Sequence, residues 1–414
     1  MLRAPTQLRS VPIRRIPSKV RALACVAIFG ALVTGAVSLS GAASHAIAAP
    51  AVKPSPKKPP PGPLLQGAGI IRWPSLYPKG TGYERYSYVI VGRDDARAAG
   101  RLPGISLVYM SGTSVQVSWS TGVSYQEALV RGWLLKDASG AYVKNIHYGA
   151  YIGDIGDVAY QQRFVSNVAA FLRATKTKGV FIDDVLGHPG LLTGGGFPAK
   201  YPTAEAWENA MVSFVAAVGP ELKTRGYYVV TNALKFVSQD VRSETGELTA
   251  EFWKRIAPYV NGLMSESWLQ NPNDAKQLRA VGTRWYENWS GWQNLAGVAQ
   301  GSGRDFFGVM YGSADDLRTM RFGRANFLLD WNGRGGAFIY FVTDRDEPYH
   351  RAWVTQYGLP LRAKFERAPG VWQRKYARGI VVVNATNAAV RVRVHGALHS
   401  IAPTDALLSP NPRG

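Results

Sequence analysis

Short apolar runs recur along the middle of the chain. Most of them end in a polar residue, and an amphipathic stretch follows. Runs of nearly continuous hydrophobicity are typical of strands that are buried on both faces of a parallel sheet. Eight such runs lie at residues 86–92, 104–110, 149–154, 179–184, 226–232, 262–266, 305–311 and 337–344.

The segments between these runs predict helices. In one of them Phe164, Val168 and Leu172 recur at helical spacing, and the segments that begin near residues 204 and 250 repeat this pattern. Strands that alternate with helices predict a parallel sheet covered by helices on its outer side, and eight repeats predict its closure into a (β/α)8 TIM barrel. The first three units are the least regular.

Polar residues stand where these helices are expected to begin. Thr203 and Thr249 are predicted to be N-caps, because a side-chain oxygen at that position can accept from the free N–H groups of the first turn. Asp157 is predicted to cap the helix that begins near Tyr160.

The pattern changes after Gln356. The stretch "GIVVVN" and the stretch "AVRVRVHG" alternate, with Val390, Val392 and Val394 on one face, and turn residues "ATNA" lie between them. Period-two alternation around a turn predicts an antiparallel hairpin. Residues 356–414 are therefore expected to form a small antiparallel β appendage that packs on the barrel.

The first residues form a different kind of segment. A head with six Arg or Lys precedes the apolar stretch 22–39, and Ala46-Ile47-Ala48 offers small residues to a signal peptidase. We expect a signal peptide over 1–48, a Pro/Lys-rich linker over 49–65 and the barrel domain over 66–355, hence a secreted, cell-envelope protein. An uncleaved membrane anchor is the alternative. Cleavage would remove the single cysteine, Cys25, and with it disulfide and thiol chemistry.

Charge is concentrated at the two ends of the chain. Of the formal net charge of +20, residues 1–83 contribute +11 and residues 356–414 contribute +7, which leaves +2 for the central domain. Basic ends on a neutral domain favour contact with an anionic surface such as a cell wall. No nucleic-acid-binding motif accompanies the charge, and the chain is expected to be a monomer without a nucleic-acid partner.

Polar residues stand at the ends of the predicted strands, where TIM barrels carry their catalytic groups. These residues are Asp154, Asp183, Asp184, Asn232, Glu266, Tyr311 and Asp344. The rim therefore carries more carboxylates than are needed to keep its loops soluble, which suggests a functional role for some of them.

Five motifs in a fixed order resemble a known family. They are "GWLLKDASGAYV", "DIGDVAYQQRFV", "KGVFIDDV", "MSESW" and "RKYARGIVVVN". Together they are similar to the hypothetical glycoside-hydrolase-like barrels of the family-fifteen group, which resemble the endo-α-1,4-polygalactosaminidases distantly. The resemblance covers residues 85–390 and implies a TIM-barrel glycosidase that acts on a polysaccharide, without specifying the sugar.

Hydrolysis of a glycosidic bond needs one carboxylic acid and one carboxylate. We assign the carboxylate to Asp183, at the end of the fourth strand, and the general acid to Glu266, at the end of the sixth, with its pKa raised by Met264 and Trp268. Because side chains alternate along a strand, Asp184 is expected to hold a loop or a sugar hydroxyl instead.

The remaining rim residues are assigned to substrate binding. We expect Asp154, Asn232, Tyr311 and Asp344 to bind sugar hydroxyls, although Asp154 could equally form a loop or replace Asp183 as the partner of Glu266. Trp268 could stack on a sugar, whereas Trp285, Trp289 and Trp292 have the spacing of one inward helix face.

The sequence argues against other chemistries. It contains no Gly-x-Ser-x-Gly elbow, no phosphate-binding Gly-x-x-x-x-Gly-Lys loop and no His-Glu-x-x-His pair, so neither a metal nor a cofactor is expected. The alternative function is a barrel that binds carbohydrate or cell wall without hydrolysing it, because a fold alone does not specify an activity.

Overall fold

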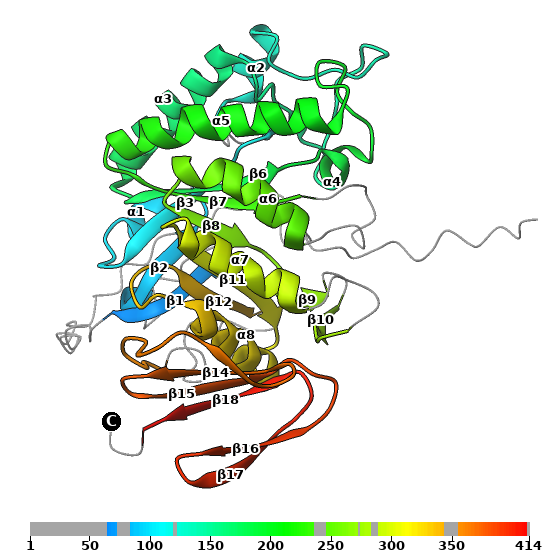
Figure 1. Ribbon diagram of the computed structural model, residues 1–414. Helices are drawn as coiled ribbons and strands as arrows, with labels where there is room; N and C mark the ends of the chain where they lie inside the picture. Colours follow the sequence, from blue (N-terminus) through cyan, green and yellow to red (C-terminus); the bar gives the residue numbers. More distant parts are fainter. Residues whose placement is uncertain are drawn as a thin grey trace, which may run out of the picture.

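Eight parallel strands form a closed barrel in the computed structural model of the chain, which confirms the predicted fold class (Figure 1). The structure describes residues 64–72, 83–118, 122–235, 246–271, 274–282, 289–342 and 355–411. The predicted signal peptide and nearly all of the linker, together with Trp285 and Asp344, lie outside the described residues. None of the helices in the described ranges combines the length and the hydrophobicity that a bilayer-spanning segment requires.

The barrel strands follow the chain in order, because each pairs in parallel with the strands before and after it. They are β1 (Leu65–Arg72), β2 (Tyr86–Val91), β3 (Ile105–Ser111), β6 (Gly179–Leu186), β7 (Tyr228–Leu234), β8 (Gly262–Ser265), β11 (Asp305–Gly312) and β12 (Ala337–Val342). β12 pairs with β1 and closes the cylinder.

One predicted strand is wrong and one was missed. Residues 149–154 form no barrel strand: β5 (Tyr151–Ile152) pairs antiparallel with β4 (Ser114–Val115) in the long connection between β3 and α3. The missing strand is β1, where Gln66 and two glycines interrupt the apolar run. Because the two errors cancel, β6 and β8 are still the fourth and sixth barrel strands.

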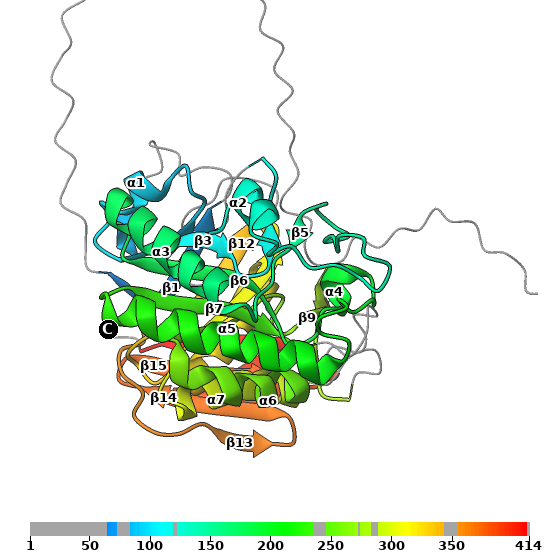
Figure 2. The same cartoon turned by 90° about the horizontal axis from the view of Figure 1, so that it is seen from above.

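Helices cover the outside of the barrel and follow one another around it (Figure 1). They are α1 (Ala96–Ala99), α2 (Tyr125–Val130), α3 (Val158–Thr175), α4 (Gly190–Thr193), α5 (Ala204–Thr224), α6 (Gly246–Ile256), α7 (Trp289–Gly301) and α8 (Leu317–Asp330), with short 3-10 turns η1 (Tyr83–Arg85) and η3 (Ala257–Tyr259). α3 and α5 lie side by side (Figure 2).

Two of the three predicted helix caps are confirmed. Asp157 accepts from the N–H of Tyr160 at the start of α3, and Thr203 accepts from Ala206 at the start of α5. The prediction for Thr249 is wrong, because this residue lies inside α6, where its hydroxyl accepts from the N–H of Lys235 at 3.1 Å.

Alternating side chains divide the apolar residues into two layers. On β6, Val180 and Ile182 point outward into the core between barrel and helices, whereas Phe181 points into the barrel interior. Met264 on β8 and Val309 on β11 also belong to the interior cluster. The interior below the rim is therefore apolar, which deprives any polar group above it of water from that side.

The C-terminal segment forms the predicted β appendage. β13 (Phe365–Ala368), β14 (Val371–Tyr376), β15 (Gly379–Asn384) and β18 (Asp405–Pro410) make a four-stranded antiparallel sheet, and β16 (Val390–Val394) pairs with β17 (Ala397–Ile401). The predicted hairpin of β15 with β16 is wrong, because β15 pairs with β14 and β18, whereas β16 pairs with β17. The inward face of Val392 and Val394 is confirmed.

The appendage packs on α8, as expected (Figure 1). Arg374, which is 9% exposed, donates through one Nη to the carbonyls of Leu328, Leu329 and Trp331 at the end of this helix. A cation at a helix C-terminus both satisfies free carbonyl groups and interacts favourably with the helix dipole. Arg374 therefore connects the two parts of the fold.

We predict that Arg374→Met lowers the free energy of unfolding by about 3 kcal/mol, because three carbonyl groups lose a charged donor in a buried place. Urea denaturation measures the change. Arg391→Met, at an exposed position of β16, is the matched control and should leave stability nearly unchanged. Equal effects of the two substitutions would contradict the role of Arg374.

Candidate active site

Asp183, Asn232 and Glu266 lie at the same end of three adjacent strands. The first two are on β6 and β7, and Glu266 directly follows β8. The same alternation that places Phe181 and Met264 in the barrel interior turns Asp183 and Glu266 inward, one step nearer the C-terminal rim. Tyr311 lies near the C-terminal end of β11, the next strand around the barrel.

The side-chain amide of Asn232 connects the two carboxylates. Its Nδ2 donates to Asp183 Oδ1 at 2.9 Å and to Glu266 Oε2 at 2.6 Å. Because both bonds meet at one nitrogen, these two oxygens are no more than about 5.5 Å apart, which is closer than the roughly 6.5–9.5 Å typical of inverting glycosidases. Asn232 itself is buried, so the amide is held firmly between them.

Two tyrosines complete the contacts of the pair. The hydroxyl of Tyr311 donates to Glu266 Oε1, and the hydroxyl of Tyr109 on β3 hydrogen-bonds to Asp183. Each carboxylate therefore accepts a hydrogen bond from one tyrosine hydroxyl, and both accept from the amide of Asn232, which lies between them. Five consecutive barrel strands, from β3 to β11, contribute to one continuous polar network.

Asp184 takes part in this network from a different direction. Its φ is 57°, in the left-handed region, and the β6–β7 register shifts between Ile182 and Val185. Its Oδ2 accepts from Ser111 Oγ at 2.8 Å and from Ser114 Oγ at 3.0 Å. Asp184 therefore holds the loop after β3, as one of the sequence-based alternatives proposed.

Burial raises the pKa values of all three carboxyl groups. Loss of water and the nearby charge of Asp184 raise the pKa of Asp183 to about 7. The hydrogen bonds that Asp183 accepts lower this pKa, but their effect is smaller. Burial and the charge of Asp183 raise the pKa of Glu266 to about 7. Burial also raises the pKa of Asp184. Desolvation thus outweighs the hydrogen bonds, and the pair retains a proton near neutral pH.

Backbone strain is concentrated beside the same pair. Among the described residues that are not glycine, six have a positive φ, and three of these are Asp184, Ser267 (53°) and Leu269 (60°). Such conformations are costly for residues with a Cβ and tend to gather at functional sites. Their position directly after Asp183 and Glu266 supports a functional role for the two carboxylates.

Two other predicted residues lie apart from this network. Asp154 is buried, and its carboxylate accepts from Lys200 Nζ at 2.5 Å and from the hydroxyl of Tyr201. Trp268 is fully buried on the outer side of the barrel, where its ring meets Phe306 edge-on. No face of this indole is open to a sugar.

The other predicted aromatic residues are structural where they are described. Trp289 and Trp292 are buried on α7, which confirms the inward helix face.

Three residues of the network were missed by the sequence analysis. Tyr109, Ser111 and Ser114 lie at or just after the end of β3. Tyr109 and Ser111 follow Leu107 at period two, and Leu107 belongs to the interior cluster. This alternation is the sequence signal that places Tyr109 and Ser111 on the inward face of β3.

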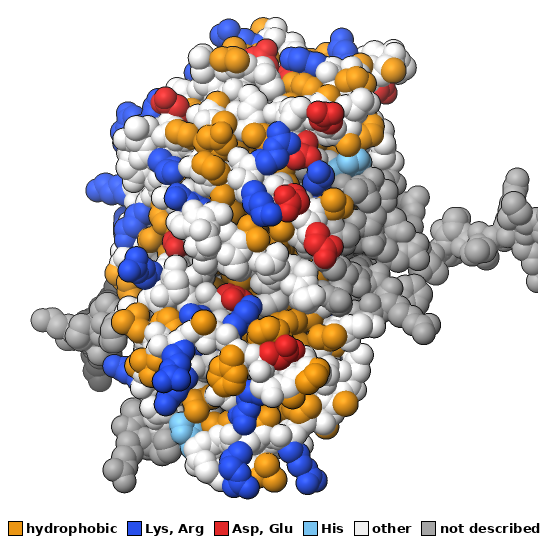
Figure 3. Space-filling view, viewed as in Figure 1, with side chains coloured by type: hydrophobic (Ala, Val, Ile, Leu, Met, Phe, Trp, Pro, Cys, Tyr) orange, Lys and Arg blue, Asp and Glu red, His pale blue; other side chains and the backbone are white. Residues whose placement is uncertain are grey.

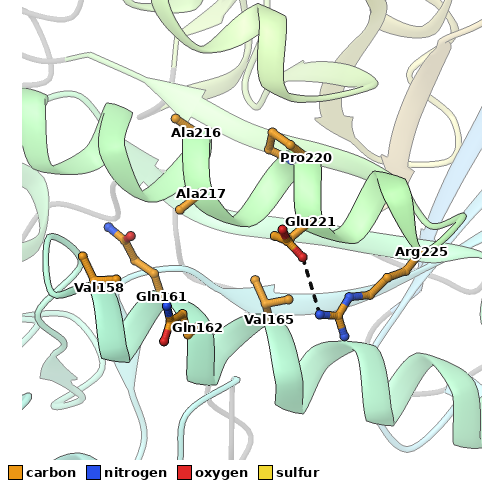
Figure 4. Close-up of a pocket in the computed structure, with 9 residues that line it drawn as sticks. All are labelled: Val158, Gln161, Gln162, Val165, Ala216, Ala217, Pro220, Glu221 and Arg225. Atoms are coloured by element: carbon orange, nitrogen blue, oxygen red, sulfur yellow. Dashed lines mark ion pairs between the residues drawn. The ribbon is translucent and has the colours of Figure 1, made fainter.

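A separate cleft of about 490 Å³ lies on the outer surface between α3 and α5 (Figure 4). Its lining includes one carboxylate, Glu221, which pairs with Arg225 at 3.5 Å. A site of this composition lacks the second carboxylate that glycoside hydrolysis requires. Within the described ranges, no group of three or more His, Cys, Asp or Glu side chains is arranged to hold a metal ion.

The fold and this pair of carboxylates define a TIM barrel of the glycoside-hydrolase type. The sequence model of hypothetical glycosyl hydrolase family 15 matches residues 111–380, so the chain belongs to this family. No curated protein matches the chain.

Solved structures with a similar fold include two hydrolases. The glycoside hydrolase domain of PelA from Pseudomonas aeruginosa is 15% identical, with a TM-score of 0.44 over 67% of this chain and 94% of that one. An α-amylase from Geobacillus thermoleovorans, complexed with acarbose, is 8% identical, with a TM-score of 0.43 over 85% of this chain and 97% of that one.

We predict that Asp183→Asn stabilises the protein more at about pH 8 than at about pH 5. The pKa of this carboxyl is about 7 in the folded chain and about 4 when unfolded, so the unfolded state loses its proton first. Between these two pKa values the carboxyl group of Asp183 therefore makes the wild type less stable as the pH rises. Asparagine does not titrate, so the variant lacks this loss of stability.

Urea unfolding of both proteins at the two pH values tests this. The relative stability of the variant should increase by about 1 kcal/mol or more between them. Asp94→Asn, at an exposed position, is the control and should show no such increase. A difference for Asp183→Asn that is the same at both pH values would contradict the raised pKa.

Proposed function

We propose that the protein is a secreted, retaining glycoside hydrolase that cleaves a polysaccharide, with Asp183 as the nucleophile and Glu266 as the general acid and base. The observation that carries this proposal is the amide of Asn232, bonded to both carboxylates at 2.9 and 2.6 Å. This arrangement supports attack by one carboxylate on a sugar carbon while the other protonates the departing oxygen.

The two roles follow from the number of donors. Asp183 accepts from the Asn232 amide, the Asp184 backbone N–H and the Tyr109 hydroxyl, whereas Glu266 accepts from Asn232 and Tyr311. Donors stabilise a charged carboxylate, so the remaining proton resides on Glu266. Asp154 is less suitable as the partner of Glu266, because Lys200 and Tyr201 already bind its carboxylate.

In the first step Glu266 gives its proton to the leaving oxygen as Asp183 attacks the anomeric carbon. In the second step Glu266 takes a proton from water, which attacks the same carbon and releases Asp183. Asn232 keeps one donor toward each group while charge moves from one to the other. Tyr311 and Asp184 lie beside the pair and are proposed to bind sugar hydroxyls as well.

The C-terminal sheets are proposed to hold the enzyme on an anionic polymer of the cell envelope. Residues 355–411 contain eight Lys or Arg and two acids, and one of those acids, Asp405, pairs with Arg321 at 2.5 Å. Arg391 and Arg393 are exposed on the outer face of β16. On the face shown in Figure 3, Lys and Arg side chains are scattered over this part of the molecule among hydrophobic and uncharged side chains.

We predict that the double substitution Arg391→Glu and Arg393→Glu weakens binding to polygalacturonate beads, because it reverses the charge of this face. Column retention at low salt measures the effect. Arg97→Glu with Arg101→Glu, at exposed positions of the barrel domain, is the control with the same change in charge. Equal loss of retention in both variants would contradict a specific C-terminal surface.

We predict that Asp183→Asn and Glu266→Gln each lower turnover at least about a hundredfold, because each keeps the shape but removes the charge or the proton. The assay is the release of reducing ends from a panel of cell-surface polysaccharides. Asp94→Asn and Glu205→Gln, both at exposed positions, are the matched controls. Full activity of either active-site variant would contradict the assignment.

The same reaction gives two further outcomes. NMR of the first products should show the anomeric configuration of the substrate, and inversion would exclude Asp183 as a nucleophile. Sugar binding by the wild type with no cleavage of any polysaccharide would favour the alternative, a barrel that binds carbohydrate without hydrolysing it.

A further inference from the structure

The chain makes an unusual turn directly after Glu266. Ser267 and Leu269 both have a positive φ, and the turn leads into a hairpin of β9 (Gln270–Asn271) and β10 (Asp274–Leu278). Two left-handed residues in three positions break the alternation of a strand. The regular β8–β11 ladder accordingly ends at the pair of Ser265 and Gly308.

The contacts between the two chains nevertheless continue beyond that point. The N–H of Trp268 donates to the carbonyl of Val309 at 2.9 Å. At the next step along β11, the side chain of Gln270 replaces the backbone: its Oε1 accepts from the N–H of Tyr311 and its Nε2 donates to the carbonyl of Tyr311, both at 2.7 Å. A primary amide has one acceptor and one donor side, so it can imitate a peptide group of a neighbouring strand.

Gln270 is itself fixed. It is 1% exposed, and its Nε2 also donates to the carbonyl of Ala275 across the hairpin. Its backbone carbonyl accepts from Arg279 Nε at 2.9 Å. A buried side chain with this many partners has little freedom to move, so it can hold Tyr311 in one place.

We propose that Gln270 is a positioning residue, which holds the backbone of Tyr311 so that the phenol stays directed at Glu266. The hydroxyl of Tyr311 donates to Glu266 Oε1, and the side chain of Gln270 hydrogen-bonds to both the backbone N–H and the backbone carbonyl of Tyr311. The catalytic meaning rests on the proposed function, because it requires Glu266 to be the general acid. The contact chain from Gln270 to Glu266 does not depend on it.

The proposal has a readout that needs no substrate. The bond from Tyr311 lowers the pKa of Glu266, against the raising effects of burial and of Asp183. Tyr311→Phe should therefore raise this pKa further above 7, by about half a pH unit or more. Gln270→Met keeps the chain length but removes both amide contacts, and it should shift the pKa in the same direction.

The experiment is a ¹³C NMR titration of the glutamate carboxyl groups, with the signal of Glu266 identified by its loss in Glu266→Gln. Because both substitutions act through one bond, the double variant Gln270→Met with Tyr311→Phe should rise no further than Tyr311→Phe alone. Gln293→Met is the matched control: Gln293 is also 1% exposed and donates to Asn326 and Asp330, far along the chain from Glu266.

A merely structural Gln270 would behave like the control, with lower stability and an unchanged pKa of Glu266, and that result would overturn the proposal. If Gln270→Met does not fold, Gln270→Asn keeps the amide but is one methylene too short to reach Tyr311, and it should raise the pKa in the same way. If the wild type hydrolyses a polysaccharide and Gln270→Met leaves the pKa of Glu266 unchanged, only the role of Gln270 is rejected. A moved pKa without hydrolysis rejects the proposed function alone.

Discussion

The amide of Asn232 is the interaction on which the rest of the site depends. Two carboxylates this close, above an apolar interior, repel each other, and one Nδ2 that donates to both offsets part of that repulsion. The offset is incomplete, because the pKa values of Asp183 and Glu266 are still raised to about 7. A carboxyl group whose pKa is raised in this way can keep a proton near neutral pH, which the general acid of the proposed reaction needs.

The barrel supplies this geometry through strand register. Asn232 pairs with Met264 in the β7–β8 ladder, so the amide emerges one step below Glu266 and beside Asp183. The strained residues then shape what surrounds the pair: Asp184 turns to Ser111 and Ser114, and Ser267 leads the chain toward Gln270. Strain of this kind persists only where neighbouring contacts hold it, and both turns have buried polar partners.

Sequence periodicity predicted a closed parallel barrel with Asp183 and Glu266 at the ends of its fourth and sixth strands, although one of the eight strands was misplaced. Each of these residues stands at the end of an apolar run, and such a local pattern indicates both the end of a strand and the side to which the side chain points. It failed where contacts between distant segments decide the structure. The strand β1 is held by its neighbours in spite of two glycines, and β15 pairs with β14 and β18 although a turn motif favoured the segment that follows it.

Backbone conformations that are rare for ordinary residues explain the other differences. Period two predicts that Trp268 lies on the same side as Glu266, but the positive φ of Ser267 interrupts the alternation and the indole is buried outside the barrel. The contact of Gln270 with Tyr311 joins residues 41 positions apart. Neither the hydrophobic pattern nor the local motif carries information about such a pairing.

Neutron crystallography at neutral pD tests the central claim most directly, because it locates the shared proton. The account predicts one deuterium on the carboxyl group of Glu266, none on Asp183, and both amide deuterium atoms of Asn232 directed at the two groups. Two bare carboxylates, or a deuterium on Asp183 in place of Glu266, would contradict it.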